Sequence, residues 1–333
     1  MKIGDYNINQ SSPVFIIAEL SANHNGSIDI AIETIRAAKR AGANCIKLQT
    51  YTAETITIDS EKADFKLKQG TIWDGTTFFK LYKEAYTPWE WHEELFKVAK
   101  EEGLICFSSP FDPTAVEFLE DLNVPAYKIA SFEITDIPLI EYVASKGKPI
   151  IISTGIAEKE DIELAIVTCK RMGNNDIALL KCTSSYPAPI DEANMAMVKD
   201  LAERYGVISG LSDHTIGSVV PIVATCFGAK IIEKHFILDR SIGGADASFS
   251  MDEKEFADMV KAVREAEKAI GVVDYSLTEK QIKGRDFSRS LYVVEDINAG
   301  ETITKKNVRS IRPGFGMHPK HYNEVLGEVA LED

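Results

Sequence analysis

Eight short runs of apolar, often β-branched residues alternate with amphipathic helical patterns through most of the chain, and this alternation limits the possible folds more than any other feature. Near-continuous apolar runs are expected of parallel strands that are covered on both faces. Eight βα units in about 250 residues are typical of a TIM barrel. No GxGxxG motif follows the first run, which argues against a dinucleotide-binding sheet. The predicted strands are residues 14–20, 45–50, 104–109, 126–131, 149–154, 177–183, 207–213 and 230–238.

The pattern changes after residue 270. Residues 271–285 are polar and punctuated by turn formers, which predicts a linker between two domains. Residues 286–333 contain two short strand candidates, 290–294 and 309–311, with Gly and Pro turns and little helical pattern. A unit this small is near the lower size limit for independent folding, so we expect it to pack on the barrel of residues 1–270 or on another subunit.

The composition argues against several classes of partner. The chain has 37 Lys and Arg against 51 Asp and Glu, and a net charge of −14 disfavours a nucleic-acid or anionic-membrane surface. No run approaches the roughly 20 apolar residues of a membrane span, and the polar amino terminus lacks the apolar core of a signal peptide. The five cysteines are scattered without metal-binding spacing, which is typical of buried thiols in the reducing cytoplasm.

Polar side chains stand at or near the end of every predicted strand, where TIM barrels carry their chemistry. Residues i and i+2 of a strand share a face, so pairs at this spacing can both point into the barrel. So many ionisable groups at one barrel mouth indicate an enzyme rather than a non-catalytic sugar-binding protein. These positions are Glu19, Lys47, Gln49, Ser108, Ser109, Lys128, Ser131, Glu133, Ser153, Thr154, Ser184, Tyr186, Asp213, His214, Glu233 and His235.

Two lysines, Lys47 and Lys128, are predicted to lie inside the barrel, where an unpaired charge is costly. Either lysine could pair with Glu19 or Glu133. Together with the strand-end hydroxyls, the two lysines indicate a ligand with phosphate or carboxylate groups. A lysine that forms a Schiff base with a keto substrate, as in an aldolase, is an alternative.

Two histidines, His214 and His235, end consecutive predicted strands. One strand-end histidine is more often structural than a ligand, but two on adjacent strands beside Asp and Glu favour a metal site. Two protein nitrogens leave coordination positions for water and substrate oxygens. That arrangement suits Mn²⁺ or Mg²⁺ as a Lewis acid better than a closed zinc site.

Several segments follow one another along nearly the whole chain: AELSANHNG, IKLQT, FSSPFD, YKIAS, STG, CTSSYP, GLSDHT and EKHF, with RPG in the C-terminal unit. Together they resemble the sialic acid synthase family of nonulosonate synthases. The resemblance implies a TIM barrel followed by a small antifreeze-like (SAF, β-clip) domain, in a domain-swapped homodimer. It also implies a transferase that condenses phosphoenolpyruvate with a six-carbon amino sugar, releasing phosphate and a nine-carbon 2-keto acid.

The resemblance assigns a role to each matching position. It implies that phosphoenolpyruvate binds to Lys47, Ser109, Lys128, Ser131, Ser153, Ser184 and Ser212. It places a divalent metal, Mn²⁺ first and Mg²⁺ or Co²⁺ as alternatives, on His214 and His235, and an acid-base role on Glu19. Sugar contacts are expected from Gln49, Glu133, Tyr186, Asp246 and, reaching from the partner subunit's C-terminal domain, Arg312.

Three departures from neuraminate-type members indicate a branch of the family. Ser109 stands where threonine is common, Ser184 stands where asparagine is common, and GGADASFSMDEKEF replaces the usual sequence around Asp246. SIGGADASFS and LSDHTIGS look most like the branch that makes pseudaminic acid. The expected sugar is then 2,4-diacetamido-2,4,6-trideoxy-L-altrose, which lacks the 6-hydroxyl of N-acetylmannosamine. Neuraminate and legionaminate synthesis are the alternatives.

Overall fold

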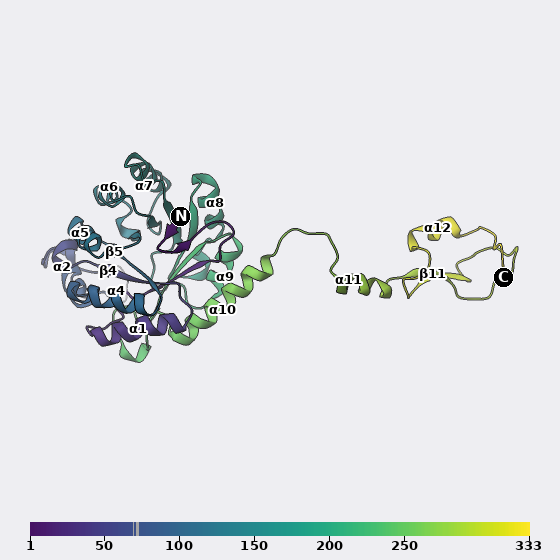
Figure 1. Ribbon diagram of the computed structural model, residues 1–333, viewed down its shortest axis with the longest axis horizontal. Coiled ribbons are helices and arrows are strands. Elements are labelled where there is room, and N and C mark those ends of the chain that lie inside the picture. Colours follow the sequence, from purple (N-terminus) through teal and green to yellow (C-terminus); the bar gives the residue numbers. More distant parts are fainter. Residues whose placement is uncertain (69, 71–72) are drawn as a thin grey trace. The chain divides into compact units, whose positions relative to one another are not determined.

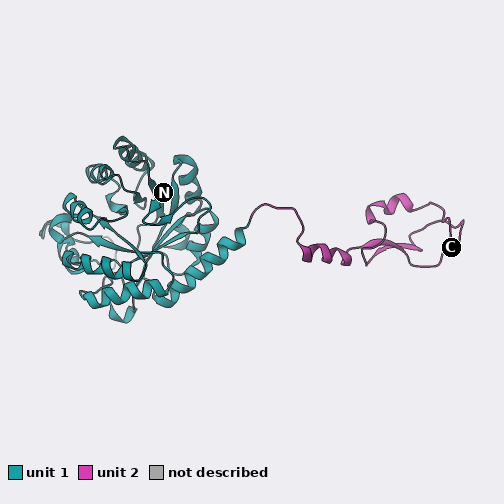
Figure 2. Ribbon diagram, in the orientation of Figure 1, with its two compact units in different colours: residues 1–271 teal, residues 272–333 magenta. Residues whose placement is uncertain are grey.

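The computed structural model describes residues 1–68, 70 and 73–333. The chain forms two compact units, Met1–Gly271 and Val272–Asp333, coloured separately in Figure 2. The second unit therefore begins with the residues predicted as a linker, and within them Glu279–Gly284 forms a short helix, α11.

The larger unit is a closed barrel of eight parallel strands surrounded by helices (Figure 1), as the alternating pattern predicted. Each strand pairs with the next along the chain, and β10 closes the barrel against β3. The register places Glu19 beside Lys47 on one side and His235 on the other. The barrel strands are β3 (Phe15–Glu19), β4 (Cys45–Thr50), β5 (Ile105–Pro110), β6 (Tyr127–Ile129), β7 (Ile150–Ser153), β8 (Ile177–Cys182), β9 (Ile208–Asp213) and β10 (Ile231–His235).

The helices of this unit begin at ordinary capping signals. Ser27 accepts a hydrogen bond from the Ile30 amide at the start of α1, and Asp112 caps α5, whose first residue is Pro113. The α-helices are α1 (Ile28–Arg40), α2 (Ala53–Ile56), α3 (Phe78–Ala85), α4 (His92–Glu101), α5 (Pro113–Asp121), α6 (Ile137–Ser145), α7 (Lys159–Arg171), α8 (Ala196–Tyr205), α9 (Val219–Cys226) and α10 (Glu253–Ile270). The short 3₁₀ helices are η1 (Ala63–Phe65), η2 (Trp89–Trp91), η3 (Ser131–Glu133), η4 (Ile190–Glu192) and η5 (Arg240–Ile242).

A hairpin that the sequence analysis did not predict covers the amino end of the barrel. Its strands are β1 (Lys2–Ile3) and β2 (Tyr6–Asn7). The Tyr6 ring lies 4.9 Å from the ring of Phe15, at the start of β3, and the Met1 amino group lies 3.6 Å from Asp176, just before β8. The hairpin therefore closes the end opposite the strand-end polar residues.

His92 is fully buried at the start of α4, and His24 is nearly so. The His92 Nε2 lies 2.9 Å from Thr50 Oγ1, and its Nδ1 lies 3.2 Å from the Pro88 carbonyl. Burial lowers the pKa of each histidine from 6.5 to about 4. Both side chains are therefore neutral in the folded protein at neutral pH.

These two histidines predict that the protein loses stability in acid. The unfolded chain takes up their protons below pH 6.5, whereas the folded chain does so only near pH 4, so stability falls as the pH falls through this window. The loss is at most about 3 kcal/mol per histidine. Urea unfolding at pH 7 and pH 4.5 measures it, and His92→Gln should lose less stability between these pH values than the native chain does. Equal losses in the two proteins would contradict the prediction.

The smaller unit contains a two-stranded antiparallel sheet, β11 (Ser290–Val293) and β12 (Val308–Ile311), close to the two predicted strands. Its other elements are η6 (Arg285–Phe287), η7 (Pro319–His321) and α12 (Tyr322–Val325). Among residues 272–333, all of which the structure describes, the buried side chains are Ser290, Leu291 and Val308. In neither unit does a helix of the described residues have the length and apolar character needed to span a membrane.

Candidate active site

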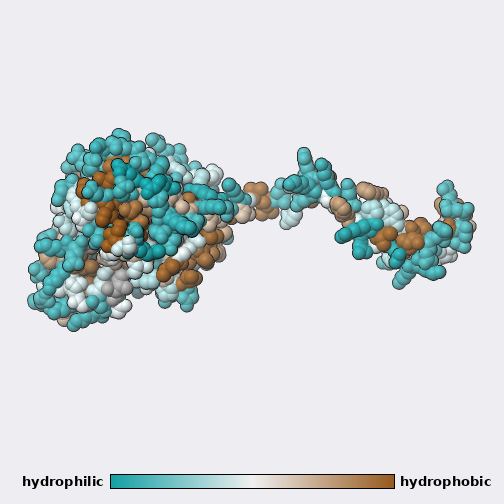
Figure 3. Space-filling view, turned by 90° about the horizontal axis from the view of Figure 1, so that it is seen from below, coloured by the Kyte–Doolittle hydropathy of each residue, from teal (hydrophilic) through white to brown (hydrophobic). Residues whose placement is uncertain are grey.

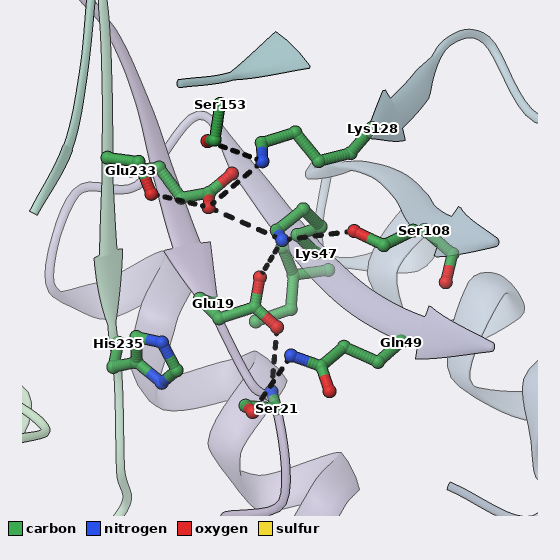
Figure 4. Close-up of polar contacts among 12 residues, drawn as sticks. Glu19, Ser21, Lys47, Gln49, Ser108, Lys128, Ser153, Glu233 and His235 are labelled. Atoms are coloured by element: carbon green, nitrogen blue, oxygen red, sulfur yellow. Dashed lines mark hydrogen bonds and ion pairs between the residues drawn. The ribbon is translucent and has the colours of Figure 1, made fainter. Parts of the chain in front are cut away.

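The barrel gathers at its carboxyl end the site residues that the sequence analysis placed in it. Figure 4 labels several of them, among them Glu19, Lys47, Lys128, Glu233 and His235. Strands β3, β4, β5, β6, β7, β9 and β10 each contribute a side chain near their ends, and the segments that follow β6, β8, β9 and β10 contribute the rest. The buried members are Glu19, Lys47, Ser108, Ser109, Lys128, Ser131, Ser153, Thr154, Ser212, Asp213, His214, Glu233 and Asp246. A cluster of charges this deeply buried is costly unless its members pair with one another or with a ligand.

Lys47 lies between two carboxylates, as Figure 4 shows. Its Nζ contacts Glu19 Oε2 and lies 3.3 Å from Glu233 Oε1. It also donates to Ser109 Oγ at 3.3 Å. Lys128 donates to Ser153 Oγ at 2.7 Å and lies 3.9 Å from the same Glu233 oxygen. Glu233 therefore links the two lysines.

These contacts resolve the pairing that the sequence left open. Glu19 is a partner of Lys47, as one reading expected. The second carboxylate of the lysine pair is Glu233 rather than Glu133. Glu233 was noted at the strand end but was given no role, although its position two residues before His235 on β10 was a signal that it faces the same interior.

Burial and charge shift the pKa values of this cluster in different directions. Burial raises the pKa of Glu19 to about 7, with Lys47 opposing the shift and Glu233 adding to it. For Lys47, burial disfavours the charge, but the two carboxylates raise its pKa above the ordinary value. Burial lowers the pKa of Lys128. A carboxyl group with a pKa near 7 can both accept and donate a proton at neutral pH.

Three hydroxyl groups and a glycine surround the Lys128 side of the cluster. The Gly155 amide donates to Ser131 Oγ at 2.6 Å, and a Cβ atom on Gly155 would overlap the hydroxyls of Ser131 and Ser184. Ser153 contacts the Lys128 ammonium itself. Hydroxyls, backbone N–H groups and an ammonium at one place are the donors that bind a phosphate or carboxylate group.

The two predicted metal ligands lie side by side, with ring centroids 5.4 Å apart. The His214 Nδ1 lies 2.9 Å from the Thr183 carbonyl, and donation to this oxygen leaves Nε2 with a free lone pair, as is usual for metal-bound histidine. The His235 Nδ1 is buried and has no hydrogen-bond partner among the described residues. A metal held by these two imidazoles would take its remaining ligands from water and substrate, because no group of three potential metal-ligating side chains occurs in the described part of the chain.

The predicted sugar-binding residues of the larger unit fall into three places. Gln49 Nε2 donates to Ser21 Oγ at 3.0 Å, and Ser21 donates to Asp246 Oδ2 at 2.5 Å, so Gln49 and Asp246 form one network. The Tyr186 ring lies 4.2 Å from the His214 ring. Glu133 is in η3, and burial raises its pKa to about 7.

Two aromatic residues that the sequence analysis missed complete this side of the mouth. The Phe249 ring lies 5.0 Å from His235 and 5.2 Å from Tyr186, and the Trp73 ring lies 5.5 Å from Tyr186. Trp73 Nε1 donates to the Ala245 carbonyl at 3.1 Å. Both residues lie in irregular segments outside the strands, so strand-end reasoning had no signal for them.

Arg312 is exposed and follows β12 in the smaller unit. It is the one predicted site residue that lies outside the barrel unit. Its contact with the sugar stays a prediction.

Comparison with known proteins identifies the family to which the barrel and the smaller unit correspond. Residues 34–275 match the model of the NeuB family, and residues 288–333 match the SAF domain. The chain belongs to the NeuB family. Both parts of the resemblance, the barrel and the antifreeze-like domain, are thus confirmed.

Members of the NeuB family with curated names align with nearly the whole chain. The chain is 48% identical to the pseudaminic acid synthase of Campylobacter jejuni subsp. jejuni serotype O:2, over 100% of this chain and 96% of that protein. It is 49% identical to the pseudaminic acid synthase of Helicobacter pylori, over 96% of this chain and 94% of that protein. The crystal structure of an N-acetylneuraminic acid synthetase from Leptospira borgpetersenii superposes with a TM-score of 0.76 at 31% identity, covering 85% of this chain and 94% of that one.

Proposed function

We propose that this chain is a pseudaminic acid synthase. It condenses phosphoenolpyruvate with 2,4-diacetamido-2,4,6-trideoxy-L-altrose and water, giving pseudaminic acid and phosphate. The observation that carries the proposal is the identity of 48% and 49%, over nearly full length, to two proteins of that name. The neuraminic acid synthetase, at 31%, is more distant, and neuraminate or legionaminate synthesis remains the runner-up.

The chemistry joins C3 of phosphoenolpyruvate to the aldehyde carbon of the open-chain sugar. Water then adds to C2. One of its protons passes, through the base, to the alkoxide formed from the aldehyde oxygen, and the other leaves with phosphate as the C–O bond to phosphate breaks, so that C2 becomes the keto carbon. Lys47 and Lys128 balance the carboxylate and phosphate charges of phosphoenolpyruvate. Their buried, paired arrangement supports this role, because fixed charges act most strongly where water is excluded.

The remaining binding roles are divided between the two substrates. Phosphoenolpyruvate is held by the hydroxyls of the β5, β6, β7, β8 and β9 ends, which are Ser109, Ser131, Ser153, Ser184 and Ser212. The sugar is held by Gln49, Glu133, Tyr186, Asp246 and Arg312. Ser131, Ser153 and Ser184 lie around Gly155 and Lys128, which supports one anion site rather than isolated serines.

We assign a divalent metal to His214 and His235, with Mn²⁺ as the first candidate and Mg²⁺ or Co²⁺ as alternatives. When bound, the metal supplies Lewis acidity to the carbonyl oxygen of the sugar. The buried Nδ1 of His235, which has no hydrogen-bond partner among the described residues, supports this assignment. Loss of turnover in His214→Ala at limiting Mn²⁺ tests it, and unchanged turnover would contradict it.

Glu19 is the proposed group that takes the proton from the attacking water. Its Oε1 accepts a hydrogen bond from the Ser21 amide, and its Oε2 contacts Lys47, so its orientation is fixed. Glu19→Gln should lower kcat by about 10²- to 10⁴-fold, because the amide cannot act as a base. Glu120→Gln is the control. Glu120 lies outside the mouth, and its Oε1 is 2.7 Å from Lys148 Nζ. Normal turnover in Glu19→Gln would exclude the role.

We further propose a homodimer with exchanged C-terminal domains. The smaller unit exposes Phe287 and Phe315 at 72% and 71%, which is unusual for a surface that nothing covers. In Figure 3, apolar residues gather in more than one area of the visible face of the larger unit, whose surface is otherwise mostly hydrophilic. Mixing of inactive Arg312→Ala and Lys47→Met chains tests the exchange, because activity should return in mixed dimers only if Arg312 acts across subunits.

The cytoplasm is the proposed compartment. All five cysteines are free thiols in the structure, and four of them are buried. Free thiols are stable in a reducing compartment.

Three assays separate the proposed reaction from the other two classes of function. Phosphate release from phosphoenolpyruvate should require both the sugar and Mn²⁺. Borohydride trapping of a keto substrate on Lys47 or Lys128, without metal dependence, would instead support a lysine aldolase. Sugar binding without phosphate release under any metal would support a binding protein.

A further inference from the structure

Asn23 lies in the segment between β3 and α1, three residues before Gly26 in the AELSANHNG motif, and is fully buried. Its Nδ2 donates to the Phe236 carbonyl at 3.0 Å and to Ser250 Oγ at 2.8 Å. Ser250 in turn donates to the Asp246 carbonyl at 2.7 Å. One side-chain amide thus joins the end of β3, the end of β10 and the segment 246–250.

Both acceptors lie on chain segments that surround His235. Phe236 directly follows His235, so its peptide group sets the backbone direction at the end of β10. The segment 246–250 carries Asp246, whose Oδ2 is 3.7 Å from His235 Nδ1, and Phe249, whose ring is 5.0 Å from the imidazole. The amide of Asn23 therefore influences both the backbone of His235 and two groups that pack against its ring.

We propose that Asn23 is a positioning residue that holds His235 and the segment 246–250 in the geometry needed to bind a divalent metal. The inference rests on the proposed metal role of His235. Asn23 has no exposed surface, so it acts through its hydrogen bonds rather than by touching a substrate.

Local backbone geometry supports a positioning role. Ser21 and Asn25, which flank Asn23 at two residues on either side, have φ values of 48° and 46°, in the left-handed region that non-glycine residues rarely adopt. Ser21 also holds Asp246, by donating to its Oδ2 at 2.5 Å. The segment between β3 and α1 therefore holds Asp246 at two points. Ser21 binds its carboxylate, and Asn23 acts on its carbonyl through Ser250.

The chain offers a matched control for a buried asparagine with a purely structural role. Asn174 is 4% exposed, and its Nδ2 also donates to two acceptors, the carbonyls of Lys148 at 2.8 Å and Ala144 at 3.4 Å. It precedes β8, at the amino end of the barrel, where side chains stabilise the fold and do not contact substrates.

The test compares Asn23→Ala, Ser250→Ala and Asn174→Ala for Mn²⁺ affinity, followed by the electron paramagnetic resonance signal of free Mn²⁺, and for unfolding by urea. We expect all three to be folded but less stable. Mn²⁺ affinity should fall about 10- to 100-fold in Asn23→Ala, fall less in Ser250→Ala and stay unchanged in Asn174→Ala. In the first variant kcat should fall while KM for phosphoenolpyruvate, which the lysines bind, stays near the native value.

Native Mn²⁺ affinity in Asn23→Ala would overturn the inference, and so would an equal loss in Asn174→Ala. If Asn23→Ala does not fold, Ser250→Ala decides, because it removes only one hydroxyl from the same chain of hydrogen bonds. Failure of the unmodified protein to bind Mn²⁺ would overturn the proposed metal site itself, and the positioning role with it.

Discussion

Replacing Lys47 by methionine should lower kcat/KM by at least about 10²- to 10³-fold, the usual cost of removing one charge-stabilising donor from an active site. The ammonium of Lys47 is the group that contacts Glu19 and lies 3.3 Å from Glu233. Without it, two buried carboxylates face each other, and no positive charge remains at this position to meet the anionic substrate. The same substitution should lower the free energy of unfolding by about 3–5 kcal/mol.

Lys181, another lysine on a barrel strand, provides the control for Lys47→Met. Lys181, on β8, is half-buried and donates to the Cys182 carbonyl at 2.6 Å and to Thr183 Oγ1 at 3.4 Å. It has no contact with Glu19 or Glu233 in the described structure, so Lys181→Met should leave kcat/KM within about threefold of native. Steady-state phosphate release measures both variants. Near-native kcat/KM in Lys47→Met would contradict the proposed role of the lysine.

Replacing Lys234 by methionine should destabilise the fold without removing a substrate contact. Lys234 is buried on β10, and its Nζ donates to Asp213 Oδ2 and to the Thr215 carbonyl, each at 2.5 Å. Its loss leaves Asp213 as a buried charge that keeps only its bonds from the Thr215 amide and hydroxyl. The free energy of unfolding should fall by about 3–5 kcal/mol, as expected for one half of a buried ion pair.

A double-mutant cycle separates the lost pair from the buried charge that remains. Asp213→Asn in the Lys234→Met background removes the unpaired charge, so the double variant should be more stable than Lys234→Met alone. Lys254 is the exposed comparison, since it lies 2.8 Å from Asp258 on the surface of α10, and Lys254→Met should leave the unfolding midpoint unchanged. A double variant less stable than Lys234→Met would contradict the account.

The barrel was predictable because its strands are buried on both faces. All eight strands fall within a residue or a few of the predicted runs, and the strand-end polar residues of the barrel lie together because parallel strands share one carboxyl end. The amino-terminal hairpin was missed because each of its strands has two residues, too few to show any periodicity. The helix α11 was missed because its sequence is polar and lies between turn formers.

The residue types at the site were predictable from the sequence, but the ion pairs between them were not. Strand position alone could not decide whether Lys47 pairs with Glu19, Glu133 or neither. The pairing depends on which side chains from different strands come within contact distance inside the barrel. Trp73 and Phe249 reach the mouth from irregular segments, whose course depends on tertiary contacts such as the bond from Trp73 to the Ala245 carbonyl. Asn23 was quoted only as part of a motif, because its role depends on residues more than 200 positions away.

The most direct test of the central claim is a competition between sugars. The protein receives phosphoenolpyruvate, Mn²⁺ and equal amounts of 2,4-diacetamido-2,4,6-trideoxy-L-altrose, its manno diastereomer and N-acetylmannosamine, and the products are separated by chromatography and identified by mass. The account predicts that pseudaminic acid forms in large excess, with phosphate released in equal amount. A predominance of neuraminic or legionaminic acid, or no nonulosonic acid with any of the three sugars, would contradict it.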